Sequence, residues 1–344
     1  MIDFRYHLVS IVAVFLALAI GIVLGSTELQ GPAYNFLDRT TSKLQNELGQ
    51  VSSQRDTAQQ QASEGEAYAQ AVEPTVLHDL LAGQRLLIVT EPGAQAGVVS
   101  GISTAAADAG ATVTGQINLA TKFFDPSGTA QDSLNQTTLD TAGAASVQLD
   151  TSATYQQQAA QVIASEILGT SLTSGSSASR STAGDQSTTA STMLQAYAAS
   201  QFLTITGQPA TPATLAVVVT PQNAPSDGSS DPLDQDLVPL VQELAGKSAA
   251  TVVVGSSSGS GAGSPIAVLR SNNVSNQVST VDDADLISGQ TVAIQALAVQ
   301  LGGGKAGSYG FTANGATTVA PSPAPTPTAS PSATSTPSTK KVKK

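Results

Sequence analysis

The feature that most constrains this chain is an uncharged apolar run near its amino terminus, Leu8–Leu24 (LVSIVAVFLALAIGIVL). A helix that crosses the hydrocarbon core of a bilayer needs about 20 consecutive apolar residues. The run reaches that length when its immediate flanks are included. We therefore predict a single transmembrane helix over residues 8–26.

The charges on either side of this run predict its orientation. Arg5 precedes the helix and Glu28 follows it, so the positive-inside rule places residues 1–7 in the cytoplasm and the body outside. A cleaved signal peptide is the alternative. The apolar run exceeds the usual length of such a segment, however, and no A-x-A cleavage site follows it. We expect an uncleaved, single-pass anchor in the cell membrane and an extracytoplasmic body in the cell envelope.

The segment after the anchor has the spacing of a coiled coil. Apolar and small residues recur in alternating steps of three and four, as in an a/d seam. The seam positions are Tyr34, Leu37, Thr41, Leu44, Leu48, Val51, Arg55, Ala58 and Ala62. We predict a coiled-coil stalk over residues 33–73, beginning after Gly31-Pro32 and ended by Pro74, that makes the protein a homo-oligomer. A single amphipathic helix lying against the body is the alternative.

The next part of the chain alternates between short apolar runs and helical patterns. This alternation is typical of βαβ units and a parallel sheet. Strands are predicted at Arg85–Thr90, Ala111–Leu119, Thr214–Thr220 and Ala250–Gly255, and helices at Gly97–Gly110, Asp234–Gly246 and Ser288–Leu301. We predict one α/β domain over residues 78–311. Its middle, Asp125–Ser200, is expected to form helices joined by a loop near Ser171–Gln186.

The chain ends in a low-complexity segment. From Ala316 to Thr339 it holds only Pro, Ser, Thr and Ala apart from Val319, and four lysines follow. Such composition predicts an extended, disordered tail over residues 316–344. The net charge is −11 and the body has no cluster of Lys and Arg, so nucleic acid is not an expected partner.

Two motifs look catalytic but lack a required residue. Residues 255–259 (GSSSG) match G-x-S-x-G, with Ser257 as the nucleophile, but no histidine follows His78 to act as its base. Residues 301–308 (LGGGKAGS) resemble a P-loop, yet Ala306 stands where Ser or Thr must hold the metal. We predict that both are turns. We expect no catalytic residue, no cofactor and no enzyme activity.

Metal ligands are scarce in this sequence. Asp282, Asp283 and Asp285 form a carboxylate cluster of the kind that suits calcium or magnesium, although acids at the start of a helix also favour the helix dipole. There is no cysteine, and the only His and Met residues of the body are His78 and Met193. No metal site is assigned from these residues.

Both ends of the chain resemble the actinobacterial copper transporter MctB family. The segments that carry the resemblance are residues 1–26 (MIDFRYHLVSIVAVFLALAIGIVLGS) with the stalk after them, 76–83 (VLHDLLAG), 279–285 (STVDDAD) and 307–310 (GSYG). The resemblance covers residues 1–311, and it is specific at the two ends rather than in the middle. It implies a membrane-anchored envelope protein with a role in copper efflux, copper tolerance or channel activity.

The residues set limits on that role. Copper(I) prefers Cys and Met, and copper(II) prefers imidazole, so we expect a body with only His78 and Met193 not to bind copper tightly. One helix also has no lumen through which an ion can pass. The alternative hypothesis is a non-catalytic scaffold that binds envelope, cell-division or wall-remodelling proteins through its stalk and α/β head.

Overall fold

The computed structural model describes residues 3–168, 179–209, 212–222, 232–259, 261, 263–310 and 321. It divides into two compact units, Met1–Ala67 and Tyr68–Lys344. Apart from Pro321, the predicted tail over 316–344 lies outside the described residues. The same holds for residues 171–178 of the loop predicted near Ser171–Gln186.

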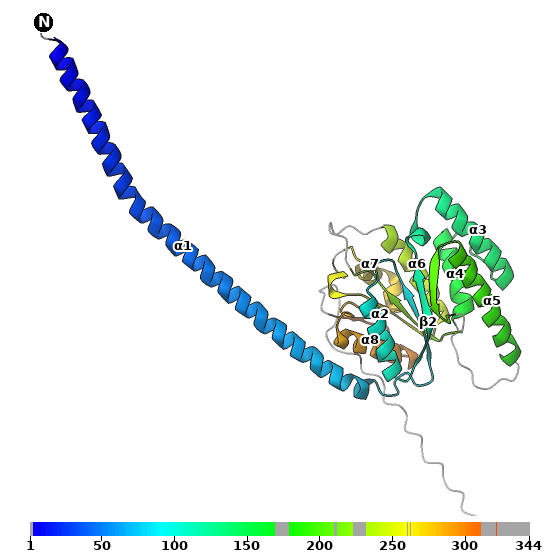
Figure 1. The fold of residues 1–344 in the computed structure, drawn as a ribbon. Helices are drawn as coiled ribbons and strands as arrows, with labels where there is room; N and C mark the ends of the chain where they lie inside the picture. The colour runs from blue at the N-terminus through cyan, green and yellow to red at the C-terminus, as the bar shows by residue number, and fades with distance from the viewer. Residues whose placement is uncertain are drawn as a thin grey trace, which may run out of the picture. The chain divides into compact units, whose positions relative to one another are not determined.

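The first element is the long helix α1, Asp3–Leu77 (Figure 1). Its segment Phe4–Gly25 is apolar and long enough to cross a membrane, which confirms the predicted amino-terminal apolar helix. The stretch predicted as a stalk over 33–73 lies within α1, which runs through Gly31-Pro32 and continues past the predicted end at Pro74 to Leu77. A proline removes one helical hydrogen bond and bends the helix, and a helix can continue past it at that cost.

The first unit leaves its apolar side chains exposed. Leu37, Leu44, Leu48 and Val51 are all more than half exposed on α1. They occupy the seam that the sequence pattern indicates, so the predicted coiled coil has its contact residues on the surface. Association through them stays a prediction.

The body is built on a seven-stranded sheet in the order β3-β2-β1-β4-β5-β6-β7. The strands are β1 Arg85–Thr90, β2 Thr112–Leu119, β3 Leu203–Gly207, β4 Leu215–Val219, β5 Ala250–Val254, β6 Ser279–Val281 and β7 Ser308–Tyr309. All neighbouring strands pair in parallel except β3, which runs antiparallel to β2 at one edge. The α/β class and the parallel sheet are therefore confirmed, with one antiparallel edge strand that the sequence pattern did not predict.

Helices cover both faces of this sheet (Figure 1). The α-helices are α2 Ala96–Asp108, α3 Gly128–Ala145, α4 Tyr155–Ile167, α5 Ser179–Ala199, α6 Pro232–Lys247, α7 Pro265–Ser271 and α8 Ile287–Leu301, and the 3-10 helices are η1 Thr121–Phe124, η2 Ser257–Gly259 and η3 Asn273–Asn276. Helices α2 and α8 pack on one face, and α3 to α7 pack on the other. The predicted loop near Ser171–Gln186 is wrong in its second part, because α5 already begins at Ser179.

The core follows from the alternation of side chains along each strand. On β1, Leu86 and Ile88 belong to the cluster beneath α2 and α8, whereas Leu87 and Val89 belong to the cluster beneath α3 to α7. A continuous apolar run is what a strand buried on both faces requires. The burial of β1 on both faces therefore explains why the apolar run RLLIVT predicts a strand.

Candidate functional site

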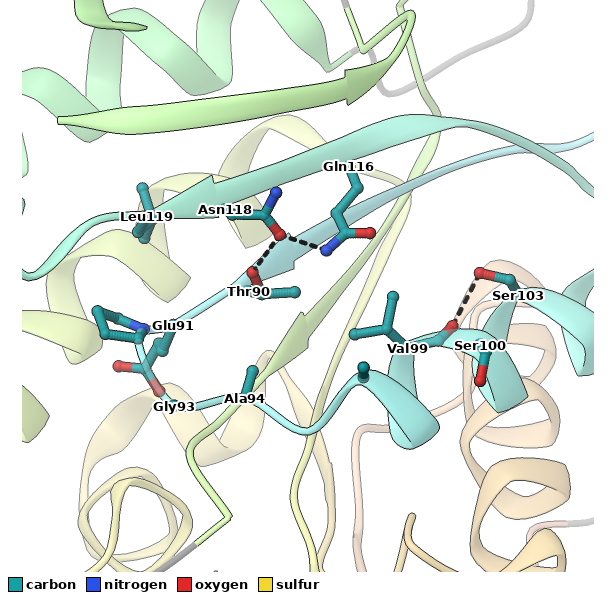
Figure 2. Close-up of a pocket in the computed structure, with 12 residues that line it drawn as sticks. Thr90, Glu91, Gly93, Ala94, Val99, Ser100, Ser103, Gln116, Asn118 and Leu119 are labelled. Atoms are coloured by element: carbon teal, nitrogen blue, oxygen red, sulfur yellow. Dashed lines mark hydrogen bonds between the residues drawn. The ribbon is translucent and has the colours of Figure 1, made fainter. Parts of the chain in front are cut away.

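An opening lies where β1 and β2 end, beside the first turns of α2 (Figure 2). It is a cleft of about 720 Å³, lined by Thr90, Glu91, Pro92, Gly93, Ala94, Ala96, Val99, Ser100, Ser103, Gln116, Asn118 and Leu119. In open α/β sheets, ligands bind in the crevice outside the carboxyl ends of the strands. The cleft occupies such a position, and its volume lies within the range of small-ligand sites.

A hydrogen-bonded ladder crosses the strands at the floor of the cleft. Thr90 on β1 pairs in register with Asn118 on β2, which in turn faces Thr204 on β3. The Thr90 hydroxyl donates to Asn118 Oδ1 over 2.8 Å, and Asn118 Nδ2 donates to the Thr204 hydroxyl over 3.3 Å. The Gln116 amide also donates to Asn118 Oδ1, as Figure 2 shows. One asparagine therefore fixes the orientation of the polar side chains around it.

The two faces of β2 explain why this ladder stays accessible. Ile117 and Leu119 point into the core beneath α3 to α7, whereas Gln116 and Asn118 alternate with them and are partly exposed on the opposite face. On β3, Thr204 and Thr206 are exposed in the same way. The α2 side of the sheet thus presents polar side chains over β2 and β3 where an apolar face would demand another helix.

Helix α2 forms the second wall of the cleft. Its early turns carry small residues, and the hydroxyls of Ser100 and Ser103 donate to the carbonyls of Gly97 and Val99. Each hydroxyl oxygen keeps lone pairs that can accept further hydrogen bonds. The wall therefore offers hydroxyl groups beside the apolar side chain of Val99.

The described lining of the cleft holds few ionisable groups. Among the described residues that line it, Glu91 is the one ionisable side chain, and it is 4% exposed. The remaining polar side chains are neutral amides and hydroxyls. This chemistry suits an uncharged, hydrogen-bonding ligand better than a metal ion, which needs several converging donors.

The G-x-S-x-G segment lies at the end of β5 and is held by hydrogen bonds. Ser256 and Ser258 donate through their hydroxyls to the Gln222 carbonyl, over 2.8 and 2.9 Å. Ser257 donates to Asp285 twice, from its backbone N–H to Oδ1 and from its hydroxyl to Oδ2. The Ser257 hydroxyl therefore contacts a carboxylate rather than an imidazole. The hydrogen bonds to Gln222 and Asp285 stabilise the turn that follows β5.

The carboxylates of the acidic cluster point to different partners. Asp282 is completely buried and forms an ion pair with Arg270, with Oδ2 and Nη1 2.7 Å apart. Asp285 binds Ser257 instead. Across the described ranges, no three His, Cys, Asp or Glu side chains come together as metal ligands. The structure thus gives Asp282 and Asp285 separate roles in packing.

The P-loop-like segment is a helix end. It follows α8, whereas a P-loop runs from a strand into a helix. The Gly303 N–H donates to the Gln300 carbonyl and the Gly304 N–H to the Val299 carbonyl, with Gly303 at φ +80°. This is the hydrogen-bond pattern of a Schellman cap, which needs a left-handed residue at that position.

The one thioether of the body, on Met193, and its one imidazole, on His78, do not share a site. Met193 on α5 is 2% exposed and packs in the cluster beneath α3 to α7. His78 follows α1 directly and is exposed, where its Nδ1 lies 3.2 Å from Asp79 Oδ2. Its neighbour Leu77 packs in the cluster on the other side of the sheet. The sheet therefore separates Met193 from the segment that carries His78.

Sequence reasoning did not find the cleft. The signal was present in residues 116–118, where polar and apolar side chains alternate along the end of a predicted strand. Such alternation indicates one uncovered face. Locating the cleft also required the positions of β3 and α2, and the sequence pattern gave no sign of β3.

Comparisons with known proteins agree with the resemblance seen at the ends of the chain. A family model described as "Copper transport outer membrane protein, MctB" matches residues 1–321. The chain is 28% identical over 326 residues to "Copper transporter MctB" of Mycobacterium tuberculosis, which covers 94% of this chain and 100% of that protein. It is also 28% identical over 329 residues to the protein of the same description from Mycobacterium leprae, covering 93% of this chain and 99% of that one.

Proposed function

This chain belongs to the MctB family of copper transport proteins, and we propose that it is a non-catalytic, membrane-anchored accessory protein in copper efflux across the cell envelope. In this role the body does not carry the ion itself. A partner protein supplies the soft copper ligands or the channel, and the anchored body binds that partner. The copper link rests on the family, and the accessory role rests on the residues described above.

The observation that carries the accessory role is the placement of the two soft donors. Copper(I) needs several sulfur or imidazole ligands around one point. Met193 is enclosed by the core on one side of the sheet, and His78 is exposed beside Asp79. A carrier would have to unfold part of the body to bring them together.

The anchor supports the envelope location. Phe4–Gly25 is the one segment, within the part of the chain that the structure describes, that is long and apolar enough to span a bilayer. With Arg5 before it and Glu28 after it, we place the body outside the cytoplasm. A reporter enzyme that is active only outside the membrane, fused after residue 80, should give signal. Activity from a cytoplasmic reporter alone would reverse the orientation.

Complementation of a deletion strain tests the accessory role. Cells that lack the gene should change their copper content, measured by elemental analysis after growth in added copper. A double variant, His78→Ala with Met193→Leu, should restore the wild-type copper content, because His78 is exposed and Leu matches Met in volume at the buried site. A folded double variant that fails to restore it would show that these donors handle copper directly.

A further inference from the structure

We propose that the cleft between α2 and the ends of β1 and β2 binds a neutral carbohydrate. This goes beyond the copper role and does not depend on it. The cleft is assembled from β1, the loop after β1, α2 and β2, and nothing in the accessory role uses it. Its ligand class follows from its hydrogen-bonding groups, its charge and its apolar surfaces.

The polar groups of the cleft can both donate and accept. The Gln116 side chain carries an amide nitrogen and a carbonyl oxygen, and the hydroxyls of Ser100 and Ser103 accept while they donate to their own helix. Each hydroxyl of a sugar likewise donates one hydrogen bond and accepts others. A surface of neutral amides and hydroxyls therefore matches a sugar more completely than it matches an acceptor-only or donor-only ligand.

The floor of the cleft is held in place before any ligand arrives. Asn118 accepts from Thr90 and Gln116 through one oxygen and donates to Thr204 through its nitrogen. These bonds restrict the rotamers of the side chains that face the cleft. A site whose side chains are already ordered loses less conformational entropy when it binds.

The charge of the cleft favours an uncharged ligand. The buried Glu91 carboxylate lies among the lining residues, and no Lys or Arg of the described chain is among them. Phosphate and acidic sugars would therefore find no cationic side chain to pair with in the described lining. The start of α2 at Ala96 favours anions, so an acidic sugar is a necessary comparison in the test.

Apolar contacts complete the match. Val99 lines the cleft beside the polar groups (Figure 2), and its partly exposed side chain offers surface for the C–H groups of a sugar ring. Among the described lining residues there is no aromatic ring to stack on the sugar. We therefore expect weak affinity, which suits detection by saturation-transfer NMR.

The test uses the full-length protein in lipid nanodiscs, because detergents with sugar headgroups would compete. The neutral probes are the tetramer of N-acetylglucosamine and maltotetraose, and the acidic probe is tetragalacturonate. The proposal expects saturable transfer to a neutral probe and weaker transfer to the acidic one. No transfer to either neutral probe, or a preference for the acidic probe, would overturn it.

Two variants locate the binding. Ser100→Trp places an indole from an exposed helix position into the cleft and should abolish the saturable signal. Ala107→Trp lies on the same helix about 10 Å further along, is exposed and does not line the cleft, so it should bind as wild type does. Circular dichroism melting checks that both variants fold. Equal binding by wild type and a folded Ser100→Trp variant would contradict the proposal.

Two supports distinguish the source of the sugar. Cosedimentation with insoluble chitin tests a wall-like polymer, and coflotation with vesicles that contain a neutral glycolipid tests a lipid headgroup. Capture on either support should be lost in Ser100→Trp and kept in Ala107→Trp. If Ser100→Trp is captured as well as wild type on both supports, the cleft is not the binding site.

Discussion

The amino-terminal unit and the body differ most in what their apolar side chains contact. On α1, Leu44 and Leu48 are 54% and 69% exposed, whereas Leu86 and Leu87 on β1 are fully buried. Among the described residues of the body, only Tyr68, Val76 and Leu139 are large hydrophobic residues that are exposed. The body thus contains its own core, whereas we predict that the first unit gains its stabilising contacts from lipid and from a second copy of the chain.

This contrast separates two kinds of variant. A change in the buried network of the body should alter its stability and leave association unchanged. A change in the α1 seam should alter association and leave the stability of the body unchanged.

The largest effect is expected from Asp282→Asn. Arg270 donates to Asp282, to the Thr280 hydroxyl and to the Tyr309 carbonyl, so it joins α7 to β6 and β7. Removing the charge of Asp282 takes the counter-ion away from a buried guanidinium, which typically costs about 3–5 kcal/mol. Urea unfolding followed by circular dichroism should show this loss in the free energy of unfolding of the body.

The matched control is Asp79→Asn, which removes a carboxylate from the exposed pair with His78. Exposed ion pairs contribute about 0–1 kcal/mol, so this variant should unfold close to wild type. If Asp282→Asn unfolds together with the control, the Arg270 network does not stabilise the body as described.

The seam should respond in the opposite way. We predict that Leu44→Asp combined with Leu48→Asp lowers the molecular mass of the protein particle, because two charges then face each other across the seam of a coiled coil. The unfolding midpoint of the body should not move. Light scattering coupled to chromatography in detergent measures the mass.

The control for the seam carries the same charge on the opposite face of α1. Asn46→Asp with Gln50→Asp adds two carboxylates away from the seam and should leave the mass unchanged. A wild-type protein that is already monomeric would refute the coiled coil, whatever the variants do.

A smaller effect is expected at high pH from Tyr197. Its hydroxyl donates to the Thr138 hydroxyl over 3.0 Å, and burial raises its pKa above the ordinary value near 10. The folded state therefore holds this proton more tightly than the unfolded state does. The resulting stabilisation is fully present below about pH 10 and is lost as the pH rises through the raised pKa.

Tyr197→Phe should remove that part of the pH dependence. The free energy of unfolding, measured at several pH values above and below 10, should fall less steeply for Tyr197→Phe than for wild type. Tyr155→Phe serves as the comparison for losing one phenol. An identical slope for wild type and Tyr197→Phe would contradict the assignment.

The sequence predicted the elements whose apolar runs are long. β1, β4 and β5 are Leu- and Val-rich and buried on both faces, and periodicity detects such strands well. Strand β3 has five residues, as many as β4 and β5, but most of its residues are exposed and it has no continuous apolar run. Strands β6 and β7 have only three and two residues. These strands are set by pairing with neighbours that are distant in sequence, so no local pattern indicates them.

Candidate sites were harder to predict than the fold. In the structure, residues 255–259 are held by hydrogen bonds to Gln222, and residues 301–308 begin with the cap of α8. The pairing of Asp282 with Arg270 spans only 12 positions, yet it depends on how α7 packs against β6. The cleft depends on residues from four elements, which only the folded chain brings together.

We propose that this protein acts in copper transport without binding the ion itself. The direct test is titration of the full-length, untagged protein in nanodiscs with Cu²⁺, and with Cu⁺ under reducing conditions, by isothermal calorimetry. An added histidine tag must be avoided because imidazole binds copper. We predict only weak, non-stoichiometric binding that His78→Ala with Met193→Leu does not change. Stoichiometric, submicromolar binding that the double variant abolishes would contradict the account.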